Sequence, residues 1–330
     1  MHCRICGNER DNRVYEAREM MYGDGDVFRY FQCSGCGCLQ IEEVPSDLST
    51  YYRGDYYSYE KIRNPNGVKR RLIDLRDKYC VWGRGWPGHV LSWVYPTSVF
   101  QFLRHVPVRI DMGILDVGCG AGRTLFALRE LGFENLLGVD PFLSGDIEYE
   151  NGLTIRKQCI DEVTGTWDVI VFHHSFEHIA DPHGTLRSVH RLLGPGGICV
   201  IRIPTVSSYA WEHYGVNWVQ LDAPRHLYLH SVESMAVISR QTGFELHRWV
   251  CDSTAFQFWG SEQYLRGIPL RHDRSHAVNP QVSAFSRRQI RDFERRAAHL
   301  NAAGRGDQAV FYLHRAESST GWQMGENPHC

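Results

Sequence analysis

Two cysteine pairs near the N-terminus have the spacing of metal ligands. Cys3 and Cys6 form one Cys-x-x-Cys pair, and Cys33 and Cys36 form a second. Two such pairs supply four thiolates at the corners of a tetrahedron, the arrangement that Zn²⁺ prefers. Four thiolates leave no open position on the metal, so the spacing predicts a structural zinc site rather than a catalytic one. Cys38 is left over, because Cys36 already closes the second pair.

A glycine-rich turn later in the chain has the pattern of a nucleotide-type cofactor site. A predicted buried strand over 114–117 is followed by three glycines: Gly118, Gly120 and Gly122. A predicted helix over 123–131 comes next, and its N-terminus favours negative charge while the glycines let the backbone approach a ligand. The next strand, 136–139, ends at Asp140. An acid about 20 residues after such a turn is placed to accept hydrogen bonds from ribose hydroxyls.

The elements around this turn predict the fold class. From residue 113 onward, apolar strands alternate with amphipathic helices, the pattern of a doubly wound, mostly parallel Rossmann-like α/β sheet, here with seven strands. In front of the sheet, apolar spacing predicts helices over 68–76 and 99–103. We predict a zinc ribbon over 1–45, an aromatic and helical linker or lid over 46–110, and a cofactor-binding domain over 111–330. This domain is predicted to carry two substrate-side insertions, at about 204–230 and about 251–307.

Composition limits the function classes. The 330 residues include 36 basic and 38 acidic side chains, 43% hydrophobic residues and eleven cysteines. These values exclude a disordered or fibrous chain, and without a basic excess a nucleic-acid partner is not expected. No apolar run approaches the ~20 residues that span a bilayer, and the N-terminus does not read as a signal peptide. We therefore expect a cytoplasmic protein without membrane contact, in which thiols stay reduced.

The third glycine distinguishes between two classes of cofactor. A dinucleotide-binding turn reads Gly-x-Gly-x-x-Gly, whereas Arg123 stands where that pattern requires its third glycine. The stretch Leu-Asp-Val-Gly-Cys-Gly-Ala-Gly at 115–122 resembles the first motif of class I S-adenosylmethionine-dependent methyltransferases. The resemblance implies S-adenosyl-L-methionine as cofactor, bound by Asp116, Gly118, Gly120, Gly122 and, at its ribose, Asp140. The segment 173–182 resembles the family's stretch after the fourth strand, which implies that His173 and His174 face the methionine side of the cofactor.

The whole arrangement is similar to one group within this family. The cysteine pairs, the tyrosine-rich linker and the core together look like bacterial sugar methyltransferases of deoxysugar and surface-polysaccharide pathways. The similarity rests on Cys33-x-x-Cys36-Gly-x-Leu-Gln and on tyrosine pairs at 51–52 and 56–57. It implies a small-molecule acceptor, first a sugar or sugar-nucleotide, and leaves O-, C- and N-methylation open.

Methyl transfer to a hydroxyl or carbon also needs a base, for which histidine is the usual choice. The segment 222–226, Asp-Ala-Pro-Arg-His, follows the fifth strand, where such sheets bind ligands, and resembles an Asp-x-Pro-Arg-His segment of this methyltransferase group. We predict that His226 is the general base and that Arg225 holds an acid or phosphate of the substrate. The alternative is a structural Asp222–Arg225 ion pair with His226 capping the next helix. Tyr56 and Tyr57 are the next candidates, as phenols of a substrate lid, unless the tyrosine run only packs domains together.

Two rival functions come from other classes. His174-Ser-Phe-Glu177-His178 matches His-x-x-Glu-His, a zinc-peptidase motif that on a helix would place both histidines on one metal with Glu177 as base. A hydrolase is therefore one alternative. A non-catalytic zinc-ribbon binding protein with a decayed enzyme fold is the other, although the intact glycines and Asp140 argue against it.

Overall fold

The computed structural model describes residues 1–52, 62, 67–95, 97 and 99–316. Its main sheet has eight strands in these residues, in the spatial order β11 (Phe244–Cys251), β12 (Gln308–Arg315), β9 (Leu193–Pro204), β8 (Trp167–His173), β4 (Ile114–Val117), β5 (Leu136–Val139), β7 (Thr154–Arg156) and β6 (Ile147–Glu148). The five strands from β9 to β7 run parallel, and β11, β12 and β6 pair antiparallel to their neighbours. The predicted doubly wound sheet is confirmed. The eighth strand, β6, has only two residues.

Helices cover both faces of this sheet, because alternate strand residues point to opposite sides. In β8, Ile170 and Phe172 pack with α4 (Pro182–Leu192) and α6 (Val232–Gln241) in one apolar core. Val169 and Val171 face the other core, with α3 (Arg123–Glu130). Two cores on a central parallel sheet hold the strand ends, and with them the glycine turn, in fixed positions.

The N-terminal ribbon is an antiparallel sheet whose fourth strand comes from the segment that follows His226. It consists of β1 (Arg13–Arg18), β2 (Val27–Gln32), β3 (Leu39–Ile41) and β10 (Tyr228–Leu229). β10 pairs with β3, Leu229 opposite Leu39. Since β10 begins two residues after His226, the ribbon is joined directly to the predicted catalytic segment. Near the ribbon's end lies the short helix η1 (Leu48–Tyr51).

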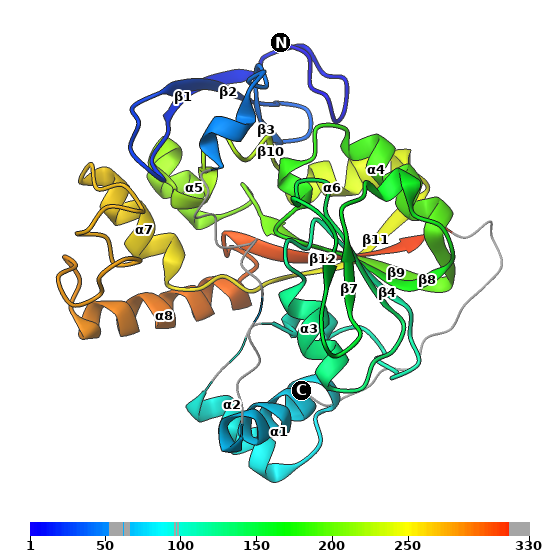
Figure 1. The fold of residues 1–330 in the computed structure, drawn as a ribbon. Coiled ribbons are helices and arrows are strands. Elements are labelled where there is room, and N and C mark those ends of the chain that lie inside the picture. The colour runs from blue at the N-terminus through cyan, green and yellow to red at the C-terminus, as the bar shows by residue number, and fades with distance from the viewer. Residues whose placement is uncertain (53–61, 63–66, 96, 98, 317–330) are drawn as a thin grey trace.

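The linker forms a helical hairpin of α1 (Val68–Trp82) and α2 (Trp86–Val94). The first predicted helix is confirmed but longer, and the prediction of a helix over 99–103 is wrong: only the single turn η3 (Gln101–Leu103) forms there. Gly83, in a left-handed conformation, ends α1, and a proline in the first turn starts α2. A Cβ on Gly88 would lie 2.3 Å from the Leu75 carbonyl oxygen, so this glycine allows the two helices to touch. The ribbon and the hairpin lie at opposite ends of the molecule in Figure 1.

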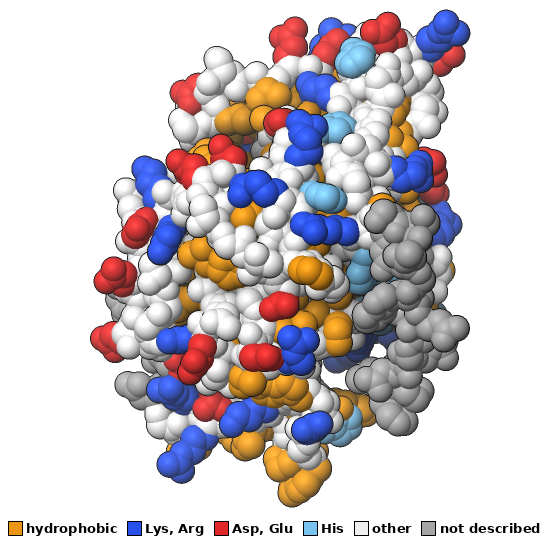
Figure 2. Space-filling view, turned by 90° about the vertical axis from the view of Figure 1, so that its right-hand side faces the viewer, with side chains coloured by type: hydrophobic (Ala, Val, Ile, Leu, Met, Phe, Trp, Pro, Cys, Tyr) orange, Lys and Arg blue, Asp and Glu red, His pale blue; other side chains and the backbone are white. Residues whose placement is uncertain are grey.

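The two insertions are mainly helical. The first contains α5 (Tyr209–Tyr214), η6 (Gly215–Asn217) and η7 (Val219–Leu221), and the second contains α7 (Phe256–Leu265) and α8 (Arg287–Ala302). Two further short helices, η4 (Ile160–Glu162) and η5 (Phe176–His178), lie before and after β8. None of the helices in the described ranges combines the length and the apolar character that crossing a bilayer requires. Basic and acidic side chains are interspersed over the face shown in Figure 2, in keeping with a formal net charge of −2.

Candidate active site

A cavity of about 690 Å³ lies where β4 and β8 end. Its wall combines the glycine turn, the segment after β8, the first insertion and part of the second. Ligands of doubly wound sheets bind beyond the carboxyl ends of the strands, and this volume is that of an ordinary small-molecule site. Six predicted site residues therefore share this cavity wall: Asp116, Gly118, Gly120, His173, His174 and His226. Gly122, Asp140 and Arg225 are not among the residues that line it.

The glycine turn leaves no room for side chains. Gly118 has φ +70°, and a Cβ there would lie 2.5 Å from the Ser175 Cβ. Gly122 has φ +76°, and its Cβ would lie 2.3 Å from the Ile155 Cδ1. Gly120 also has a positive φ, of 55°. Both the conformation and the close neighbours require glycine here, so these residues shape a turn that exposes backbone to the cavity.

Two buried carboxylates lie behind this turn. Asp140 accepts hydrogen bonds from the backbone amides of Gly120 and Phe142, both at 2.9 Å. Asp116 lines the cavity, and its Oδ1 is buried with no hydrogen-bond partner among the described residues. Burial, and secondarily the charge of Asp140, raises the pKa of Asp116 to about 7. An unsatisfied buried acid beside a glycine cradle fits a ligand that carries positive charge and hydroxyl donors, as S-adenosylmethionine does.

His173 and His174 end β8 and belong to one polar network. Arg202 Nη1 donates to the Nε2 atoms of His173 and His174, at 3.0 and 2.8 Å, and Arg202 Nε donates to Asp252 at 2.6 Å. Burial, followed by the charge of Arg202, lowers the pKa of His174 to about 3. Both histidines line the cavity as neutral rings. Their predicted role beside the cofactor stays a prediction, and no sequence motif pointed to Arg202 or Asp252.

His226 lines the same cavity, and one of its ring nitrogens has no hydrogen-bond partner among the described residues. Its Nδ1 donates to the Gln220 carbonyl at 2.8 Å, because that carbonyl can only accept. The neutral ring then carries its lone pair on Nε2, which lies 3.8 Å from Asp222 Oδ2 and 3.9 Å from Glu177 Oε1. The side chain of His226 is only 9% exposed. This geometry is that of a candidate base with its tautomer set by a backbone partner.

Arg225 does not have the predicted geometry of a substrate-binding residue. Its side chain is 0% exposed, and its nitrogens donate to both oxygens of Asp222, to Glu19 Oε1 and to the Tyr51 carbonyl. Burial opposes the charge of Arg225, but Asp222 and Glu19 raise its pKa further above its usual value. The structural ion pair that was the alternative is the observed arrangement, with a second carboxylate from the ribbon added. Tyr56 and Tyr57 lie outside the described residues.

Glu177 and His178 were not among the predicted methyltransferase residues, yet they line the cavity. One ligand-type atom each from Glu177, His178 and His226 lies within 4.8 Å of the others. The peptidase motif had singled out Glu177, but its helix is absent: only the single turn Phe176–His178 forms, and His174 has φ +56° with its Nε2 occupied by Arg202. The sequence feature that could have identified Glu177 and His178 is their position, four and five residues after the end of the central strand β8.

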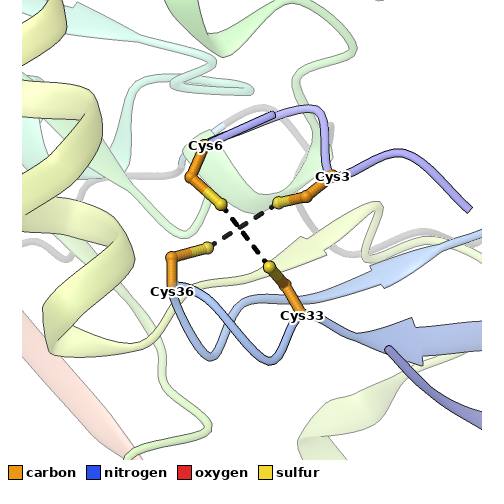
Figure 3. Close-up of side chains that lie close together, drawn as sticks. All are labelled: Cys3, Cys6, Cys33 and Cys36. Carbon is orange, nitrogen blue, oxygen red and sulfur yellow. Dashed lines mark hydrogen bonds between the residues drawn. The ribbon is translucent and has the colours of Figure 1, made fainter. Parts of the chain in front are cut away.

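The four predicted zinc ligands converge in the ribbon (Figure 3). Sγ–Sγ distances are 3.7 Å between Cys3 and Cys36 and 3.5 Å between Cys6 and Cys33. Zn–S bonds of about 2.3 Å place sulfur atoms about 3.8 Å apart at tetrahedral corners. The hydrogen bond from Cys36 lowers the pKa of Cys3 to about 4, and amide groups also point at the sulfurs, as in Gln40 Nε2 to Cys3 at 3.2 Å. The donor set fits a metal that binds thiolates.

Comparison with known proteins agrees with this geometry. A family model described as "Methyltransferase domain" matches residues 102–248. This region contains the glycine turn, both buried acids, the segment after β8 and His226. Residues 102–248 therefore match a methyltransferase domain, and this region forms most of the Rossmann-like sheet.

Curated relatives share part of this domain. Proteins named ubiquinone biosynthesis O-methyltransferase match from Maricaulis maris, 31% identical over 34% of this chain and 49% of the relative, and from Colwellia psychrerythraea, 34% identical over 27% and 40%. One from Xanthomonas oryzae pv. oryzae is 24% identical over 54% of this chain and 82% of the relative. The chain thus spans about half or less of the first two relatives. Among solved structures, a cyclopropane synthase from Mycobacterium tuberculosis superposes with TM-score 0.42 and 18% identity, over 65% of this chain and 82% of that one.

Proposed function

We propose that this methyltransferase domain transfers a methyl group from S-adenosylmethionine to a hydroxyl group of a small acceptor held against His226. The observation that carries the proposal is the free Nε2 of His226, which faces a cavity that also contains the glycine turn and Asp116. The acceptor is, in the first instance, a sugar or sugar-nucleotide, as the similarity to sugar-pathway enzymes suggests. The O-methyltransferase names of the curated relatives support oxygen as the methylated atom and add an acceptor of ubiquinone biosynthesis as a second class.

The chain's own residues would align the acceptor and move its proton. When bound, the cofactor supplies a methyl group on a positively charged sulfur, which leaves as a neutral thioether. His226 Nε2 takes the proton of the attacking hydroxyl, and the nearby Asp222 carboxylate, 3.8 Å away, stabilises the imidazolium that results. The cavity wall excludes water from the reacting atoms.

Replacing His226 by glutamine tests the proposal. Turnover of methyl-labelled S-adenosylmethionine should fall about 10²–10⁴-fold, the usual effect of removing a general base, while affinity for S-adenosylhomocysteine is unchanged. The matched control is His183→Gln, since His183 lies at the surface of α4, bonds to Gln241 and is not in the cavity wall. A panel of sugars, sugar-nucleotides and phenols serves as acceptors. If the His226→Gln enzyme methylates at the normal rate, the base lies elsewhere, and Tyr56 and Tyr57 are the next residues to change.

The four cysteines of the ribbon support a second part of the proposal, a structural zinc ion held by Cys3, Cys6, Cys33 and Cys36. A cytoplasmic location agrees with the thiols: none of the ten cysteines that the structure describes is in a disulfide.

A further inference from the structure

Glu177 is a buried carboxylate whose oxygens have no hydrogen-bond partner among the described residues. Its side chain is 0% exposed, and it lines the cavity beside His226. A buried charged acceptor that lacks a donor is costly, so native proteins rarely contain one without a partner. The missing donor is therefore expected to come from a ligand.

The neighbouring imidazoles do not satisfy this carboxylate. The Nδ1–H of His226 is used by the Gln220 carbonyl, and the Nδ1–H of His178 by the Arg225 carbonyl at 2.8 Å. His174 Nδ1 lies 3.4 Å from Glu177 Oε1 without forming a hydrogen bond. Oε2 has no donor in the part of the chain that the structure describes. Glu177 and His226 thus present two neighbouring acceptors, with 3.9 Å between Oε1 and Nε2.

We infer that Glu177 is an acceptor-binding residue and that the substrate is a diol, with hydroxyl groups on adjacent carbons. Two hydrogen-bond acceptors side by side require two donors side by side, and such a diol offers them at the usual O–H···O and O–H···N distances of about 2.7–3.0 Å. This inference rests on the proposed function. Sugars and dihydroxylated rings can each carry such a pair of hydroxyl groups.

The two hydroxyls then have different fates. One gives its proton to His226 Nε2 while its oxygen forms the new bond to the methyl carbon and the carbon–sulfur bond of the cofactor breaks. The other keeps its proton and donates it to Glu177, which fixes the orientation of the acceptor. The proton on His226 passes to solvent after product release. The expected product is a monomethyl ether, because the second oxygen is never deprotonated.

Paired acceptors test the inference and separate the two sources of the diol. Catechol is compared with guaiacol, and methyl mannoside with its 2-deoxy analogue, in turnover and in binding to the enzyme–S-adenosylhomocysteine complex. One of the two acceptor pairs, aromatic or sugar, should resemble the true substrate. In that pair, kcat/KM for the diol should exceed kcat/KM for the analogue with one hydroxyl blocked or removed by about 10²-fold, the effect of losing a hydrogen bond to a charged group. Glu177→Gln should lower the diol value toward that of its partner and leave affinity for S-adenosylhomocysteine unchanged. Glu212→Gln is the control, because Glu212 pairs with Arg305 at the surface and neither residue is in the cavity wall.

Three results would overturn the inference. Equal turnover of both members in both arms by the unmodified enzyme rejects the diol but leaves methyl transfer to hydroxyls intact. If diol and analogue do not differ in turnover or in binding to the enzyme–S-adenosylhomocysteine complex, the diol inference is also rejected, whether or not the proposed methyl transfer is correct. Binding of Mn²⁺ that is lost in Glu177→Gln while the ribbon zinc remains would make Glu177, His178 and His226 metal ligands instead of acceptor-binding groups.

Discussion

Asp116 illustrates how a single buried residue can report on the cofactor. It carries an unsatisfied oxygen in the cavity wall, and burial together with Asp140 raises its pKa to about 7. Below about pH 7, Asp116 in the folded protein is therefore mostly protonated. An ordinary exposed aspartate, with a pKa of about 3.9, is already ionised over most of this range. A cationic cofactor beside it favours the ionised form, so binding and deprotonation are linked.

The affinity for S-adenosylmethionine should therefore rise as the pH increases from about 6 to about 7 and then level off. Calorimetry in buffers of different ionisation enthalpy should also detect proton release below pH 7. In Asp116→Asn the affinity should be lower and independent of pH over this range. S-adenosylhomocysteine, which lacks the sulfonium charge, should show a weaker pH dependence with the unmodified protein. Affinity that falls with rising pH would contradict this account of Asp116.

At the scale of elements, the ribbon acts as the support of the predicted catalytic segment. β10 completes the ribbon sheet, the Tyr30 hydroxyl donates to the His226 carbonyl at 2.9 Å, and Ser231 Oγ donates to the Cys36 carbonyl at 2.5 Å. The Arg225–Glu19 ion pair adds a buried electrostatic link at 2.8 Å. The segment that carries His226 is thus held between two sheets, which fixes the orientation of its backbone.

Removing Arg225 from the buried ion pair should destabilise the segment that carries His226. Arg225→Met leaves Glu19 and Asp222 buried without their cation and should lower the free energy of unfolding by about 3–5 kcal/mol. Arg305→Met, which removes the exposed pair with Glu212, should cost less than about 1 kcal/mol. Denaturant titration measures both variants. A stability loss for Arg225→Met as small as that of the control would mean that the ribbon does not depend on this link.

The whole molecule behaves, in its packing, as one unit. Ribbon residues such as Tyr30, Phe31 and Ile41 share a single apolar core with Phe172 of β8 and Phe258 of α7. Metal binding contributes folding free energy to small segments, and a shared core passes that contribution to the sheet. The α1–α2 hairpin is less integrated: Trp86 and Trp93 are 80% and 79% exposed.

Zinc removal should consequently destabilise more than the ribbon. Elemental analysis should find about one zinc per chain, and the double variant Cys3→Ser, Cys6→Ser should lose it because half of the ligands are gone. Its melting temperature should fall in a single transition, since ribbon and sheet share one core. Cys159→Ser is the control, as Cys159 is exposed and does not belong to the cluster. Two separate transitions, or a zinc content unchanged in the double variant, would contradict the structural zinc site.

The sequence by itself determined the features that depend on short stretches of chain. Strand periodicity, the spacing of the cysteine pairs and the three glycines are local patterns, and local backbone physics is enough to interpret them. They predicted the sheet, the cofactor turn and the cysteine cluster. Tertiary structure alone decided the environments of Arg225 and Glu177. Arg225 meets Glu19 across 206 positions. Glu177 has no hydrogen-bond donor among the described residues, because His226 and His178 turn their N–H groups toward backbone carbonyls and His174 Nδ1 stays 3.4 Å away without forming a hydrogen bond. Burial and charge pairing of this kind depend on which distant segments meet, and no local pattern encodes that.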